Sequence, residues 1–134
     1  MFLTKECDYG VRIIRALSDG GKKTVDKISV AEQIPQKYAY KIVNKMVQSG
    51  LVNSTRGRVG GYHLNKALDS ITLLDIIKAV DANRYVNECL HPDASCHFKG
   101  KSEQPCKVHA ELERIQMMIV SELNAKTMDE VLQV

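Results

Sequence analysis

The stretch from residue 33 to residue 68 contains no aspartate or glutamate, and this constrains the chain more than any other feature of its sequence. A solvated protein surface normally mixes both signs of charge, because like charges repel one another. A segment of one sign therefore indicates an anionic partner, either a nucleic acid or an anionic membrane surface. The basic residues of this segment are Lys37, Lys41, Lys45, Arg56, Arg58 and Lys66.

The rest of the composition narrows the class of protein. The chain has 134 residues, which fits one domain, and its net charge of +3 combines +6 over residues 1–65 with −3 over residues 66–134. No apolar run approaches the roughly 20 residues that span a bilayer. Glu6 and Asp8 interrupt the apolar core that a signal peptide would need. We therefore expect a cytoplasmic protein that is not associated with a membrane.

Capping residues and the spacing of apolar residues predict a mainly helical chain. The expected helices cover residues 4–17, 24–31, 35–48, 71–80, 108–125 and 127–132. The helix at 71–80 is expected to start after Asp69-Ser70. Between the third and fourth helices, the segments LVNSTR and YHLN flank the glycine-rich GRVGG and predict a β-hairpin. Residues 81–105 have no periodicity and predict an irregular segment.

A short helix, a turn, a second helix and a basic hairpin form the plan of a winged helix-turn-helix. A helix about 10–12 Å wide fits a major groove about 12 Å wide, and the arginines of the hairpin can lie along a groove. Taken singly, the lysines are a solvated face, the tyrosines are packing residues and the hairpin is a plain turn. Their order in an acid-free segment favours double-stranded DNA. The expected contacts are Gln36, Lys37, Tyr38, Tyr40, Lys41, Lys45, Arg56 and Arg58.

Three cysteines, Cys89, Cys96 and Cys106, lie in or at the edge of the irregular segment, and His109 follows the last of them by three residues. A cytoplasmic chain keeps its thiols reduced, so structural disulfides are not expected. Thiolates are ligands of iron–sulfur clusters and zinc, but the absence of a Cys-x-x-Cys pair argues against a zinc ribbon. A metal or cluster site, unliganded thiols and redox-switch thiols all stay open on spacing alone. Cys7 is expected to be a small buried hydrophobe.

Residues 3–81 resemble the Rrf2 family of bacterial winged-helix regulators. The matching stretches are LTKECDYG, IPQKYAYKIVNKMVQSGLVNSTRGRVGGYHLN and SITLLDIIKAVD, of which GLVNSTRGRVGGYHL is the most specific. The resemblance continues through a cysteine-bearing loop and a long helix. It implies a homodimeric transcription factor, usually a repressor, that binds an imperfect palindrome. It also implies a DNA-binding domain at residues 1–81, a sensor loop at 82–107, and a dimerisation helix and tail at 108–134.

The resemblance further implies an iron–sulfur cluster, 2Fe–2S in preference to 4Fe–4S, on Cys89, Cys96 and Cys106. The fourth ligand would be His109 or Asp8 of the partner subunit. The gaps between these cysteines are wider than in the best-known cluster sensors of the family. The alternative is a cluster-free regulator controlled by a partner protein or a small thiol metabolite. An enzyme using Cys106 and His109 is not expected, because no orienting acid or oxyanion-hole glycines stand beside them.

Overall fold

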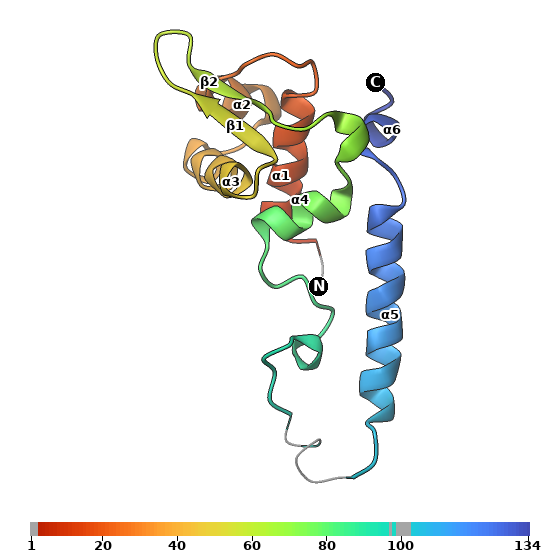
Figure 1. The fold of residues 1–134 in the computed structure, drawn as a ribbon. Coiled ribbons are helices and arrows are strands. Elements are labelled where there is room, and N and C mark those ends of the chain that lie inside the picture. Colours follow the sequence, from red (N-terminus) through yellow and green to blue (C-terminus); the bar gives the residue numbers. More distant parts are fainter. Residues whose placement is uncertain (1–2, 97, 99–102) are drawn as a thin grey trace.

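A computed structural model describes residues 3–96, 98 and 103–134 of the chain and confirms a mainly helical protein with one small β-hairpin (Figure 1). Short 3₁₀ turns, η1 and η2, precede the fourth and fifth helices and span Leu68–Ser70 and Glu88–Leu90. The main elements are α1 (Lys5–Ala16), α2 (Val25–Glu32), α3 (Gln36–Gln48), β1 (Val52–Thr55), β2 (Gly61–Leu64), α4 (Leu73–Val80), α5 (Lys107–Asn124) and α6 (Met128–Leu132).

Threonine caps begin the first, second and fourth helices. The hydroxyls of Thr4 and Thr24 each accept a hydrogen bond at 3.3 Å from a backbone N–H in the first turn of their helix. Such a bond satisfies one of the N–H groups that have no partner within the helix. Thr72 caps α4 through a capping box with Asp75, so the expected start after Asp69-Ser70 is wrong. Asp69 and Ser70 instead belong to η1.

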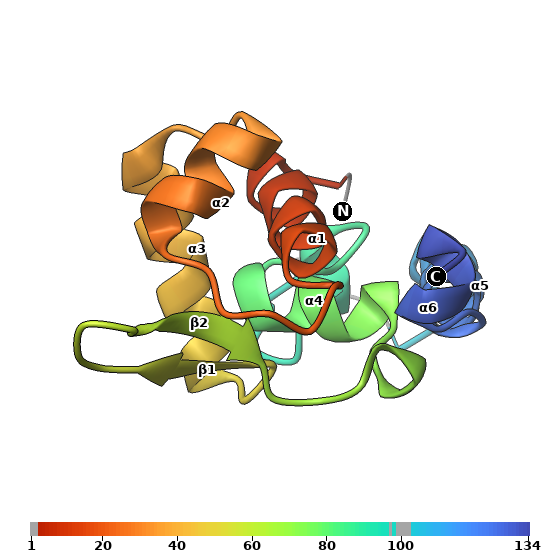
Figure 2. The same cartoon turned by 90° about the horizontal axis from the view of Figure 1, so that it is seen from above.

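The hydrophobic core lies among α1, α2, α3 and α4, which gather around one centre (Figure 2). α3 contributes Ile42, Val43 and Met46, each 0% exposed. These three residues belong to the apolar face that the helical spacing predicts for α3. A Cβ at Gly10 of α1 would lie 3.0 Å from a methyl group of Ile76, so the close approach of α1 and α4 depends on this glycine.

The hairpin forms a two-stranded antiparallel sheet that projects beside α3 (Figure 1). Its register pairs Val52 with Leu64 and Thr55 with Gly61. The backbone of Lys23 adds a bridge to the outer side of β2, with two hydrogen bonds to Tyr62 of 2.9 and 2.8 Å. The base of the wing is therefore fixed to the helical core, while its tip at residues 56–60 extends away.

The long helix α5 stands away from this core, and the chain then returns to it (Figures 1 and 2). α5 has no buried residue along its length. After it, the backbone N–H of Met128 donates to the carbonyl of Ile71 at 2.7 Å, and the Met128 side chain is 0% exposed. The end of the segment predicted as dimerisation helix and tail thus packs into the first domain. Within the described ranges, no helix has the length and apolar character needed to cross a membrane.

Candidate DNA-binding surface and cysteine loop

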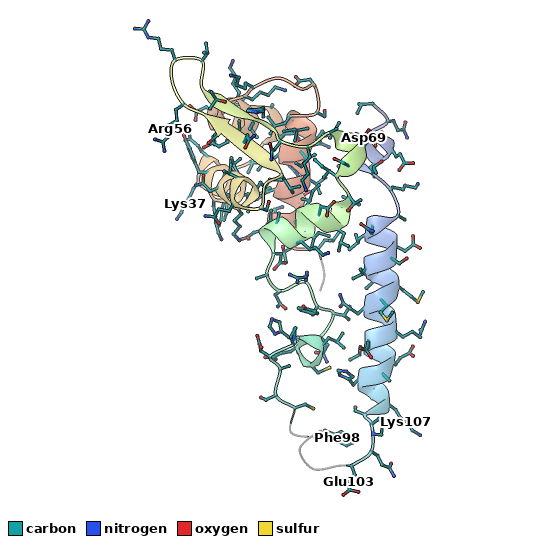
Figure 3. All side chains as sticks on the ribbon, viewed as in Figure 1. Lys37, Arg56, Asp69, Phe98, Glu103 and Lys107 are labelled. Atoms are coloured by element: carbon teal, nitrogen blue, oxygen red, sulfur yellow. The ribbon has the colours of Figure 1, made fainter. Side chains whose placement is uncertain are left out.

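α3 and the wing present unpaired cations on one side of the molecule. Lys37 and Arg56 both project on the side away from α5 (Figure 3). Their side chains and that of Arg58 are exposed. None of the three forms an ion pair with a residue that the structure describes. Exposed cations without acidic partners are available to phosphate groups.

The polar residues at the start of α3 have different surroundings. Gln36 donates a hydrogen bond from its amide to the Asp26 carboxylate of α2, which joins the two helices of the helix-turn-helix. Tyr38 packs against Tyr9 of α1 with ring centroids 5.9 Å apart, so part of its ring belongs to the helix packing. Tyr38 and Tyr40 are nevertheless each 46% exposed, which leaves ring edges and hydroxyls at the surface.

Lys41 and Lys45 both form ion pairs with an acidic residue that lies outside the acid-free segment 33–68. Glu6 of α1 places its Oε1 atom 2.5 Å from Lys41 Nζ and its Oε2 atom 2.7 Å from Lys45 Nζ. Hydrogen bonds from Lys41 and then Lys45 lower the pKa of Glu6, and the hydrogen bond to Glu6 raises the pKa of Lys41. Lys45 Nζ also donates to the carbonyl of Val80 at 2.9 Å.

This contact changes the interpretation of the three α3 lysines, which recur every four residues. Lys37 is free of acidic partners among the described residues, Lys41 shares Glu6, and Lys45 is held by both a carboxylate and a carbonyl. Sequence reasoning missed Glu6, and no local signal could have found it, because it lies 35 residues before Lys41 in the chain. The face expected to carry one sign of charge thus contains one acid from another helix.

The three cysteines of the irregular segment have different surroundings. Cys89 and Cys96 line an open pocket of about 420 Å³, and Cys89 Sγ accepts a hydrogen bond from the Asn87 amide at 3.4 Å. Cys106 is the N-cap of α5, where its Sγ accepts a hydrogen bond from the backbone N–H of His109 at 3.4 Å. All three cysteines are partly exposed, whereas Cys7 is buried at 2% exposure, as its position predicts.

The imidazole of His109, three residues after Cys106, carries an unsatisfied polar atom. Its Nδ1 atom is buried and has no hydrogen-bond partner in the described parts of the chain. Buried polar atoms are normally hydrogen-bonded, and an imidazole nitrogen without a partner is suited to binding a metal. Asp8 lies on α1 and forms an ion pair of 3.0 Å with Arg12. Among the residues that the structure describes, no group of three or more histidine, cysteine, aspartate or glutamate side chains is arranged to hold a metal ion.

The cysteine loop is tied to both α5 and the core. Gln116 of α5 accepts a hydrogen bond from the backbone N–H of Val86 at 2.7 Å and donates one to the carbonyl of Arg84 at 3.2 Å. At the start of the loop, Asp81 accepts a hydrogen bond from the Thr4 hydroxyl at 3.3 Å. The far end, marked by Phe98 and Glu103, lies at the end of the molecule opposite the wing (Figure 3).

The family model for Rrf2, described as an iron-dependent transcriptional regulator, matches residues 3–133. The chain belongs to the Rrf2 family. A protein of Haemophilus influenzae named as an HTH-type transcriptional regulator is 32% identical to this Rrf2 chain over 133 residues, covering 97% of this chain and 85% of that protein. Protein aau3 of Rhizobium meliloti is 32% identical over 91 residues, or 66% of this chain and 59% of that protein.

Solved structures confirm the fold of this Rrf2 protein. The global cysteine regulator CymR of B. subtilis matches with a TM-score of 0.75 at 24% identity, covering 98% of this chain and 95% of that chain. IscR of T. potens matches with a TM-score of 0.75 at 20% identity, covering 99% and 87%. The winged-helix resemblance is therefore confirmed. The protein is a DNA-binding transcriptional regulator and not an enzyme.

Proposed function

We propose that the protein is a cytoplasmic homodimeric repressor that binds an imperfect palindrome through α3 and the wing. The unpaired cations on one face carry this proposal, because Lys37, Arg56 and Arg58 project where no acid of the described chain reaches them. A dimer would present two such faces to half-sites one helical turn apart. The proposed contacts are Gln36, Lys37, Tyr38, Tyr40, Arg56 and Arg58, with Lys45 holding α3 in place and Lys41 reaching phosphate only when it leaves Glu6.

The surface of α5 supports the dimer. Val108 and Met117 are each 68% exposed and Met118 is 55% exposed, although all three are apolar. The side chains of Leu112, Ile115 and Ile119 are only partly covered. Val108, Leu112, Ile115 and Ile119 share one face of α5, because they follow one another at spacings of four, three and four residues. Exposed apolar surface on an unpaired helix face marks a site of protein association. A second copy of α5 would remove this surface from water, and it would also fix the distance between the two copies of α3.

The donor set of the loop supports a resident iron–sulfur cluster. Cys89, Cys96 and Cys106 supply three thiolates, and His109 supplies an imidazole whose Nδ1 has no partner in the described chain. Asp8 of the partner subunit is the alternative fourth ligand. When bound, the cluster would supply a centre sensitive to oxidation and to loss of iron. These residues fit the group by their chemistry, and the donors would have to gather more closely than the described side chains do to hold it.

The contacts at the start of the loop offer a route from this site to DNA. Lys45 of α3 binds the carbonyl of Val80, and the next residue, Asp81, binds Thr4 of α1. A shift of the chain at Val80 and Asp81 therefore acts on both α1 and α3. Gln116 attaches the same loop to α5, which is the proposed dimer helix. A coupling of about 1–3 kcal/mol between loop and DNA affinity would be sufficient for a switch.

A second candidate is a cluster-free regulator controlled by a partner protein or a small thiol metabolite. The observation that favours it is that the described donors are not gathered into a metal site. The two candidates differ in colour and composition. Iron and sulfide analysis with a visible spectrum, on protein purified without oxygen, separates them. We expect equimolar iron and sulfide, visible absorption, and loss of both in Cys106→Ser. Colourless, iron-free protein from iron-replete cells would support the second candidate.

A further inference from the structure

Glu6 divides the cations of the DNA-facing surface into two kinds. Its carboxylate binds Lys41 and Lys45, at 2.5 and 2.7 Å. Lys37, one helical turn before Lys41, has no acidic partner in the part of the chain that the structure describes. Lys37 is therefore ready to bind phosphate, whereas Lys41 must first give up the carboxylate that it already holds.

Lys41 and Lys45 differ in their exposure and in the number of partners that hold them. The Lys45 side chain is 35% exposed and has a second partner in the Val80 carbonyl, so it is held within the domain. The Lys41 side chain is 52% exposed, and Glu6 is its only ion-pair partner among the residues that the structure describes. The Glu6 side chain is 28% exposed, so its charge lies at the edge of the same surface. Of these two lysines, only Lys41 would become able to reach a DNA phosphate if Glu6 lost its charge.

We propose that Glu6 limits the affinity of this protein for DNA of any sequence by withholding Lys41 from the phosphates. The inference rests on the proposed placement of α3 on DNA. A cation that is free to bind phosphate adds a contact that does not depend on base sequence. A cation that already holds a carboxylate releases no counterion from DNA unless that ion pair breaks. Glu6 thus acts as an affinity-determining residue, while the base contacts set sequence preference.

The substitution Glu6→Gln tests this, because it removes the charge and keeps the size of the side chain. Binding is measured by fluorescence anisotropy over a series of salt concentrations. Two labelled duplexes are used, one selected by the parent protein from a random library and one of scrambled sequence. We expect tighter binding to both duplexes. The salt slope, which is the slope of log binding constant against log salt concentration, should steepen by about 0.9 for each bound protomer, equivalent to about 3.5-fold per protomer between 50 and 200 mM salt. The ratio of the two affinities should not change.

The matched control is Asp69→Asn, which changes the net charge by the same amount. Asp69 lies on the side of the molecule away from Lys37 and forms no ion pair with a described residue (Figure 3). A gain in Glu6→Gln no larger than in Asp69→Asn would overturn the inference. So would a gain that persists when Lys41→Gln is added, because the freed lysine would then not be its cause.

A second comparison does not depend on the folding of the Glu6 variant. In the otherwise unchanged chain, Lys37→Gln should lower the salt slope by about 0.9 for each bound protomer, and Lys41→Gln should lower it by much less. Equal losses of salt slope in the two variants would show that Glu6 does not withhold Lys41. That result would overturn this inference but would leave the proposed function in place. No loss with Lys37→Gln would contradict the placement of α3 on DNA, and thus the proposed function as well.

Discussion

Replacing Lys45 and Lys37 separately by methionine should separate stability from DNA binding on one helix. Lys45 Nζ makes two hydrogen bonds, at 2.7 Å to Glu6 and at 2.9 Å to the Val80 carbonyl. Hydrogen bonds to charged groups contribute about 1.5–3 kcal/mol when they are well shielded from water. The side chain is 35% exposed and Glu6 would keep Lys41, so the lower end applies. We expect Lys45→Met to lower the free energy of unfolding by about 1–2 kcal/mol.

Lys37→Met is the matched control, because it makes the same chemical change at an exposed position without an acidic partner in the described chain. Its free energy of unfolding should stay within about 0.5 kcal/mol of the parent. Urea denaturation followed by circular dichroism measures both variants, at one protein concentration because the stability of a dimer depends on concentration. DNA binding should show the opposite order, with the larger loss of salt slope in Lys37→Met. Equal losses of stability in the two variants would refute the role of Lys45 in holding α3 against the rest of the domain.

Three further perturbations test other parts of the account. Gln116→Ala should raise hydrogen exchange at the Val86 amide about fivefold, equivalent to the loss of about 1 kcal/mol of hydrogen bonding; unchanged exchange would show that α5 does not hold the loop. Met128→Ala should cost about 2–5 kcal/mol in urea denaturation, because the side chain is 0% exposed, and a negligible loss would contradict the return of the chain to the core. If iron controls DNA binding, chelation should change the operator affinity of the parent but not that of Cys106→Ser; an equal response in both would remove the cysteine loop from the mechanism.

Much of the fold follows from local chemistry that the sequence displays. Thr4 and Thr24 stand immediately before their helices, and Gly50 takes a φ of 81° just after α3. The glycine-rich GRVGG between two short β segments predicts the wing. Each of these signals acts over a few residues, and so the sequence alone is sufficient to predict these helix ends and the hairpin. The start of α4 was misplaced because Ser70 and Thr72 are both capable caps, and the capping box selects Thr72.

The contacts between distant segments were not predictable in the same way. The ion pairs of Glu6 with Lys41 and Lys45 depend on the packing of α1 on α3. The burial of Met128 depends on the turn after α5, which returns the chain to Ile71. Charge counting along the chain finds no acidic residue near the lysines of α3. Only the three-dimensional packing adds Glu6 to this face and separates Lys37 from the two later lysines.

The salt dependence of DNA binding by the double variant Lys37→Gln/Arg56→Gln tests the central claim most directly. The claim is that the free cations of α3 and the wing bind the phosphates of one duplex. On the duplex selected by the parent protein, the double variant should have a salt slope smaller by about 1.8 for each bound protomer, with its free energy of unfolding unchanged. A variant that folds normally and keeps the parent slope would contradict this account of the DNA-binding surface.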